Sequence, residues 1–183
     1  MKTKLKNRIS LIIVCVSLLV LAFSCKKEAD NPETITDIDG NVYNTVTIGT
    51  QVWMKENLKT TKFNDGDEIP LVTGGTQWTN LTTPGFCWQD NNEGTYKDDY
   101  GALYNWWAVN TNKLCPAGWH VPSKAEISEL ITILGGENVA GGAMKEKGTT
   151  HWISPNEGAT DSKGFSGLPG GFRYGQGGNF RPV

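Results

Sequence analysis

The chain has 183 residues and a mass of 20.0 kDa, which is enough for one ordinary domain and a short appendage. Charged residues make up 20% and hydrophobic residues 38%, a balance typical of a globular chain. The formal net charge of -2 excludes a strongly basic nucleic-acid-binding protein, and two His with four Cys exclude a dense zinc or disulfide scaffold. The 22 Gly and seven Trp indicate a loop-rich fold rather than a helical bundle.

The first 24 residues have the pattern of an export signal. Four basic residues and no acidic one lie within residues 1–8, and an apolar segment runs from Leu11 to Phe23. This segment is shorter than the ~20 residues that span a bilayer, so it indicates a signal peptide rather than a transmembrane helix. Ser24 before Cys25 is typical of the site where a bacterial lipoprotein is cleaved and its Cys is lipidated. A plain signal peptide cut elsewhere is the alternative.

We therefore predict a lipid anchor on Cys25 and a charged tether over residues 25–34. Cleavage removes four of the 17 basic residues and none of the 19 acidic ones, so 13 basic residues remain and the net charge is -6. The tether resembles the Lys- and acid-rich segments of surface-exported lipoproteins in the Bacteroidota. This predicts attachment to the outer membrane or cell surface, although charge runs are more often plain solvated linkers.

Two thiols remain in the predicted mature domain, on Cys87 and Cys115. An even pair in an exported chain predicts a disulfide bond. A catalytic thiol is the alternative, and it needs a basic neighbour that lowers its pKa. Neither Cys has His beside it in sequence, which favours the disulfide.

Short strands and turns dominate the first half of the mature chain. Asp39-Gly40 predicts a hairpin turn, and the strand after it should bury Val42, Val46 and Ile48, which share one face. Residues 73–84 predict a loop anchored by Trp78. We expect strands over residues 42–48, 51–54 and 86–88.

Two helices are expected in the second half. Ser123 and Glu126 fit a capping box, the apolar residues that follow have helical spacing, and Gly135-Gly136 supplies the stop. Residues 138–146 predict a shorter helix. Residues 101–109 are apolar and predict a helix or a buried strand, and helix is favoured for their first half. From Gly148 onward we expect turns and short strands.

Several motifs in order along the chain resemble a single family. They are residues 39–43 (DGNVY), 48–54 (IGTQVWM), 56–58 (ENL), 100–106 (YGALYNW), 114–123 (LCPAGWHVPS), 148–152 (GTTHW) and 164–173 (GFSGLPGGFR). Together they resemble the Fibrobacter succinogenes major paralogous domain, which is found in exported lipoproteins. That family is similar to the formylglycine-generating-enzyme branch of the C-type-lectin-like fold. The resemblance implies an irregular, loop-rich α+β domain with short twisted strands and two helices.

The chain departs from this resemblance in two ways. Family members usually continue past the Gly-rich stretch with another strand and a closing segment, so we expect the domain over residues 35–183 to be C-terminally incomplete. The formylglycine-generating branch works through Cys residues late in its domain, and no Cys follows Cys115 here. Oxidase chemistry is therefore not expected.

An acidic segment is the one candidate metal site. Its oxygen-bearing side chains suit calcium, although a complete EF-hand pattern is missing and a solvated loop is the favoured alternative. The candidate ligands are Asp90, Asn92, Glu93, Asp98 and Asp99. Beyond calcium, no cofactor is predicted. His120 and His151 are expected to support local structure, because no third ligand or paired carboxylate accompanies them.

Aromatic residues offer a candidate ligand surface, because flat rings stack on sugars in exported proteins. Filling the core is the alternative for most of them. The candidates are Trp78, Trp88, Trp106, Trp107, Trp119, Tyr100 and Tyr104.

These observations favour a lipid-anchored, non-catalytic binding domain whose partner is a glycan or an envelope protein, with no nucleic-acid partner. An enzyme on the same fold is one alternative, but no Gly-x-Ser-x-Gly motif or phosphate-binding loop is visible. A purely structural envelope protein is the other alternative.

Overall fold

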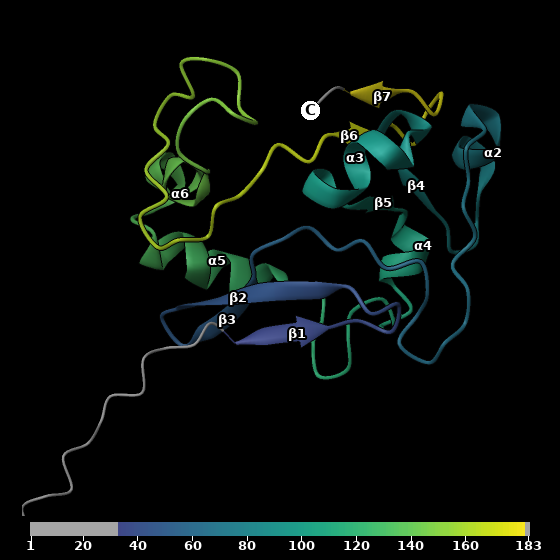
Figure 1. Cartoon of the computed structure of the whole chain (residues 1–183), viewed down its shortest axis with the longest axis horizontal. Helices are drawn as coiled ribbons and strands as arrows, with labels where there is room; N and C mark the ends of the chain where they lie inside the picture. The colour runs from purple at the N-terminus through teal and green to yellow at the C-terminus, as the bar shows by residue number, and fades with distance from the viewer. Residues whose placement is uncertain (1–32, 182–183) are drawn as a thin grey trace, which may run out of the picture. The chain divides into compact units, whose positions relative to one another are not determined.

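The computed structural model describes residues 33–181, which belong to one compact unit (Figure 1). The predicted signal peptide, Cys25 and the tether up to residue 32 lie outside the described residues. Among the helices of residues 33–181, none has both the length and the apolar character needed to cross a membrane.

The described chain begins with a three-stranded antiparallel sheet. Its strands β1 (Thr34–Thr36), β2 (Val42–Ile48) and β3 (Gln51–Met54) are neighbours in that order. In the β1–β2 turn, Asp37 Oδ1 accepts the backbone N–H groups of Asp39 and Asn41 at 3.0 and 2.9 Å. Gly40 adopts a φ of +85°, which glycine reaches without strain. The predicted Asp39-Gly40 hairpin is confirmed.

Strand β2 changes its buried face part-way along, which the alternation in the sequence did not predict. Val42 is 58% exposed, whereas Tyr43 is fully buried and its hydroxyl donates to Asp37 Oδ2 at 2.6 Å. Further along, Ile48 is buried as expected. Residues 42–44 pair with β1 and residues 45–48 pair with β3, so each half of the strand faces a different environment. The prediction that Val42 is buried is therefore wrong.

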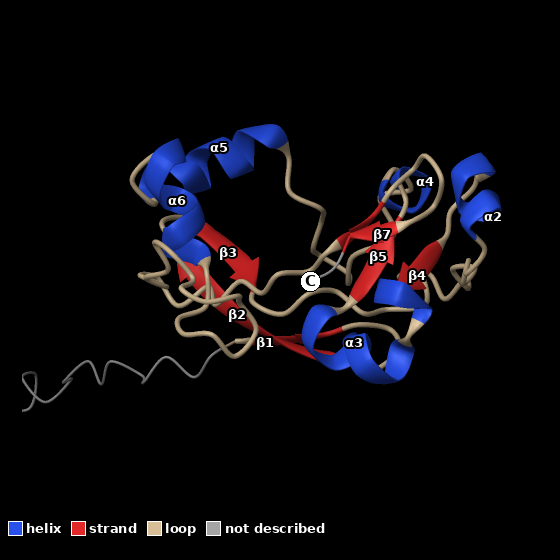
Figure 2. Ribbon diagram, turned by 90° about the horizontal axis from the view of Figure 1, so that it is seen from above, coloured by secondary structure: helices blue, strands red, loops and turns tan. Residues whose placement is uncertain are grey.

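Helices α5 (Lys124–Ile133) and α6 (Glu137–Met144) lie together at one end of the domain, beside β3 (Figure 2). Both predicted helices are confirmed. In the capping box, Ser123 Oγ accepts the N–H of Glu126 at 3.3 Å, and Glu126 Oε2 accepts the N–H of Ser123 at 2.7 Å. The apolar faces of both helices pack against the sheet in a cluster formed by Ile48, Leu130, Leu134, Ala140 and Ala143.

The other end of the domain is built on a second, two-stranded antiparallel sheet (Figure 2). Its strands are β4 (Phe86–Trp88) and β5 (Ala102–Tyr104). Every residue of β4 is buried, and the strand contributes to two clusters. One contains Phe63, Ile69, Phe86, Trp88, Ala108 and Leu114; the other contains Val72, Trp78 and Cys87.

Three short α-helices surround this second sheet and were not predicted. They are α2 (Gly75–Asn80), α3 (Glu93–Tyr100) and α4 (Trp106–Val109), and a 3-10 helix, η2 (Gln89–Asn91), precedes α3. Trp78 is the buried anchor of its segment, as expected, but that segment is helical. Residues 102–104 form a strand because they pair with β4, so the helix favoured there is wrong and the strand alternative is confirmed.

The C-terminal part of the described chain forms turns and a short hairpin, as predicted. Strands β6 (Phe172–Arg173) and β7 (Phe180–Arg181) pair in it. The domain is therefore of mixed α and β type, with five α-helices among residues 33–181 rather than the two that the family resemblance implied. Helices α2 and α3 are short and polar, and α4 has only four residues, so none of their sequences shows the apolar period that reveals a longer helix.

Candidate functional site

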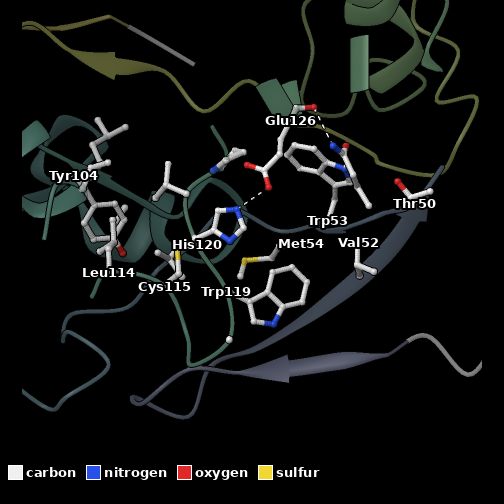
Figure 3. A pocket seen from close by; sticks show the side chains of 18 residues that line it. Thr50, Val52, Trp53, Met54, Tyr104, Leu114, Cys115, Trp119, His120 and Glu126 are labelled. Carbon is white, nitrogen blue, oxygen red and sulfur yellow. Dashed lines mark hydrogen bonds and ion pairs between the residues drawn. The ribbon is translucent and has the colours of Figure 1, made fainter. Parts of the chain in front are cut away.

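A cavity of about 700 Å³ lies between β3 and the start of α5 on one side and β5 with residues 114–122 on the other (Figure 3). Most of its lining is apolar, with polar groups near the first turn of α5. A smaller hollow of about 210 Å³ shares residues Leu114, Cys115 and Trp119–Pro122 with it. The principal side chains of the main cavity are Gln51, Trp53, Met54, Tyr104, Trp119, His120 and Glu126.

The wall on the β3 side is fixed by Gln51. Its side-chain N–H group donates to the carbonyl oxygen of Glu126 and to Glu129 Oε2, both at 3.2 Å. Its side-chain oxygen accepts the indole N–H of Trp53 at 3.2 Å. The ring of Trp53 also meets Phe165 edge-on, with centroids 6.3 Å apart. The Trp53 indole is therefore held in place before any ligand arrives.

The polar end of the cavity is a contact between His120 and Glu126. His120 Nε2 lies 2.8 Å from Glu126 Oε1, as the dashed line in Figure 3 shows. The backbone N–H of Ser123, followed by the Ser123 hydroxyl and His120, lowers the pKa of Glu126 to about 2. Glu126 is therefore a carboxylate at neutral pH.

The floor of the cavity is apolar. Tyr104 lies there with Leu114, and the Tyr104 hydroxyl is occupied by a 2.7 Å hydrogen bond to the carbonyl oxygen of Thr60. Burial raises the pKa of Tyr104 well above its usual value, so the ring remains neutral. Figure 3 shows Met54 between the Trp53 and Trp119 side chains.

The sequence pattern of the family described as Fibrobacter succinogenes major domain matches residues 46–182. The chain belongs to this family. The matched segment contains every residue that lines the cavity. No curated protein and no solved structure shows a significant match to the chain.

Within this Fibrobacter succinogenes major domain, the structure does not gather the predicted calcium ligands into one site. Four of them are engaged with other protein groups: Asp90 with Tyr96 at 3.1 Å, Asn92 with the N–H of Thr95 at 3.2 Å, Glu93 with Lys97 at 2.7 Å and Asp98 with Lys59 at 3.2 Å. Asp98 and Asp99 lie at the far end of α3 from Asp90. Among residues 33–181, no group of three or more His, Cys, Asp or Glu side chains is arranged to hold a metal.

The predicted disulfide is not formed in this family domain, because Cys87 and Cys115 are free thiols in the structure. Alternation along β4 directs Cys87 to the cluster around Trp78, away from the face that contacts Leu114. Cys115 instead lines the cavity. Burial raises the pKa of both thiols, which disfavours a reactive thiolate at either position.

Both His residues contact a carboxylate from their own segment. His151 Nδ1 lies 2.8 Å from Glu146 Oε2, in an arrangement separate from the cavity lining, and His120 contacts the capping-box glutamate. The expectation that both support local structure agrees with these contacts.

Only two of the seven aromatic candidates, Tyr104 and Trp119, line the main cavity. Trp78 and Trp88 are core residues, as the alternative reading proposed. The other three candidates are Trp106 and Trp107, which are exposed on α4, and Tyr100, which contacts His151. Sequence reasoning missed Trp53 as a site residue, although it lies in the family motif of residues 48–54.

Proposed function

We propose that this chain is a lipid-anchored protein of the bacterial outer membrane or cell surface, and that its domain binds a glycan without catalysing a reaction. The observation that carries the proposal is the preformed cavity with Trp53 and Trp119 in its walls (Figure 3). We further propose that the mixed α and β domain is a variant of the C-type-lectin-like fold.

The cavity has the two kinds of surface that a sugar ring requires. The indoles of Trp53 and Trp119 offer flat apolar faces for the C–H groups of the ring. His120 and Glu126 offer a ring nitrogen and carboxylate oxygens for hydroxyl groups at the same cavity, and Gln51 Oε1 retains one acceptor position. A largely apolar site with a few convergent polar groups is the usual design of a small-molecule site.

The polar groups support binding rather than catalysis. A general acid or base works best when its pKa lies near the operating pH, and the pKa of Glu126 is about 2. Glu126 is also the one carboxylate among the described residues that line the cavity, so a pair of carboxylates of the kind used in glycoside hydrolysis is not assembled there.

The envelope location is supported by the sequence rather than by the cavity. The basic start, the apolar segment and Ser24-Cys25 favour export followed by lipidation. The resemblance of the ordered motifs to a family found in exported lipoproteins implies the same location.

The binding proposal is tested by substitutions in the cavity wall. A glycan array identifies a ligand of the native protein, and calorimetry then compares Trp53→Ala and Trp119→Ala with it. We expect each variant to bind about tenfold more weakly, because each loses one stacking surface. The matched control is Trp107→Ala, since Trp107 is 45% exposed and lies outside the cavity lining.

Unchanged affinity in both cavity variants would place the glycan elsewhere and contradict the proposal. A folded native sample that binds no glycan on the array would also contradict it. Thermal melts of each variant separate lost binding from lost folding, which matters most for Trp53 because it packs on Phe165.

A further inference from the structure

We propose that the glycan bound in this cavity carries a positive charge, as an amino sugar does, and that Glu126 selects it. This inference rests on the proposed function, because it takes the cavity to be the glycan site. It specifies the charge of the ligand and the residue that recognises this charge.

The charge of the cavity wall is the first observation. Within the described residues 33–181, the lining includes no Lys or Arg, and its one carboxylate belongs to Glu126. Since the pKa of Glu126 is about 2, this carboxylate is ionised at neutral pH. Glu129 adds a second carboxylate beside the cavity, where Thr50 and Gln51 donate to it at 3.2 Å.

The second observation is that Glu126 lies between the segments that carry the two indoles, and that the Trp53 indole is linked to it through Gln51. Gln51 accepts from the Trp53 indole and donates to the Glu126 carbonyl, both at 3.2 Å. On the other side, Trp119 directly precedes His120, whose ring contacts the Glu126 carboxylate at 2.8 Å. Figure 3 shows the carboxylate between the Trp53 ring and His120, with Trp119 beyond.

The Glu126 carboxylate retains capacity for a ligand. Its two oxygens accept from His120 and from the backbone N–H of Ser123, whereas a carboxylate offers about four acceptor positions. The Glu126 side chain is 36% exposed, so a ligand can reach the remaining positions.

An ammonium group interacts favourably both with the carboxylate and with the indole faces of the cavity wall. It forms a charge-assisted hydrogen bond or ion pair with a carboxylate, and it is attracted to an indole face within about 6 Å of the ring centroid. A neutral sugar of the same shape gains only the stacking and the ordinary hydrogen bonds. The arrangement of Trp53, Glu126 and Trp119 therefore favours the charged sugar.

The test compares two oligosaccharides of glucosamine that share the same sugar backbone. In one probe each amine is acetylated and neutral, and in the other each amine is trimethylated and permanently cationic. Calorimetry of both probes in the same buffer at the same pH makes the charge on the sugar the variable that is compared. We expect the native full-length mature protein to bind the cationic probe at least about tenfold more tightly.

The deciding variant is Glu126→Gln. Gln at this position still completes a capping box, so the variant removes the charge while it retains the helix start. The matched control is Glu137→Gln, the same change in the first turn of α6 and outside the cavity lining. We expect the preference for the cationic probe to disappear in Glu126→Gln and to persist in Glu137→Gln.

Each outcome supports or overturns the inference. Equal affinity of the native protein for both probes overturns the inference. This comparison uses no variant, so the misfolding of a variant cannot affect it. A preference that survives in a folded Glu126→Gln variant also overturns it. Binding of the neutral probe that depends on Trp53 and Trp119 leaves the proposed function standing, whereas failure of both probes and of the glycan array contradicts both proposals.

Discussion

The two carboxylate oxygens of Glu126 have different roles. One oxygen accepts the backbone N–H of Ser123 and completes the capping box of α5, and the other contacts His120 in the cavity wall. Because the cap fixes the side chain, the charge in the cavity is oriented by local helix chemistry rather than by long-range packing. The stability of the helix start and the charge of the site are therefore coupled through this residue.

That coupling predicts a defined pH dependence of stability. The folded-state pKa of Glu126 is about 2, lowered from 4.5 by the Ser123 backbone N–H first, so its stabilising effect is present above about pH 4.5. The stabilising effect of Glu126 is lost as the pH falls from about 4.5 through about 2. In melts at a series of pH values, we expect the native protein to exceed Glu126→Gln in stability near neutral pH and this difference to vanish near pH 2.

Glu137→Gln is the control for this measurement, because it makes the same change in the first turn of α6, where no side chain caps the helix start. Its stability should follow that of the native protein at every pH. A difference between the native protein and Glu126→Gln that stays constant across the acidic range would show that the cap does not depend on the carboxylate charge.

At the scale of elements, α6 shows how packing distinguishes two adjacent glycines of the same helix. Gly141 is exposed, and a Cβ there would meet no atom within 4 Å. Gly142 instead packs against the backbone of Gly158, whose carbonyl oxygen occupies the place of a Cβ. The adjoining loop is held there by a 2.8 Å hydrogen bond from the N–H of Thr160 to the carbonyl of Gly142.

We therefore predict opposite effects for the same substitution at these two positions. Gly141→Ala should stabilise the domain by about 0.5–1 kcal/mol, because Ala loses less backbone entropy than Gly in a helix. Gly142→Ala should destabilise it by about 1–3 kcal/mol, because the loop of Gly158 must move. Chemical denaturation of both variants measures the two changes, and a stabilised Gly142→Ala variant would mean that α6 and the loop do not pack closely.

At the scale of the whole molecule, the domain has three small hydrophobic clusters in place of one large core, and polar residues join distant segments. Arg173 is the clearest example. Its guanidinium donates to the carbonyl oxygens of Val72, Thr73 and Gly178 at 2.7 to 2.8 Å, and it stacks between Trp78 and Phe180. This contact attaches the β6–β7 hairpin to the segment before β4.

The proposed membrane attachment also belongs to this scale, and it has its own test. In cells given labelled fatty acid, Cys25→Ala should abolish incorporation of the label, because the thiol of Cys25 is the proposed site of lipidation. Cys15→Ala, within the apolar segment of the proposed signal peptide, is the matched control and should label normally. Label retained by Cys25→Ala would exclude the proposed anchor.

The sequence by itself determined the features that depend on neighbouring residues. These are the Asp39-Gly40 hairpin, the capped helix α5 with its glycine stop, and the strands at residues 51–54 and 86–88. Turn conformations and capping boxes depend on hydrogen bonds between side chains and backbone groups a few residues apart. Their patterns can therefore be recognised in the sequence without knowledge of the fold. The ordered family motifs likewise identified the domain family.

Only the tertiary structure decided the features that depend on residues far apart in the chain. The face change in β2, the strand at residues 102–104 and the separation of Cys87 from Cys115 all follow from which segment packs beside them. The cavity is of the same kind, since Trp53 and Glu126 are 73 positions apart and meet through Gln51. The helix and strand propensities of a short segment do not identify the distant residues that pack against it. Where the pattern of the segment is weak, these tertiary contacts decide its conformation.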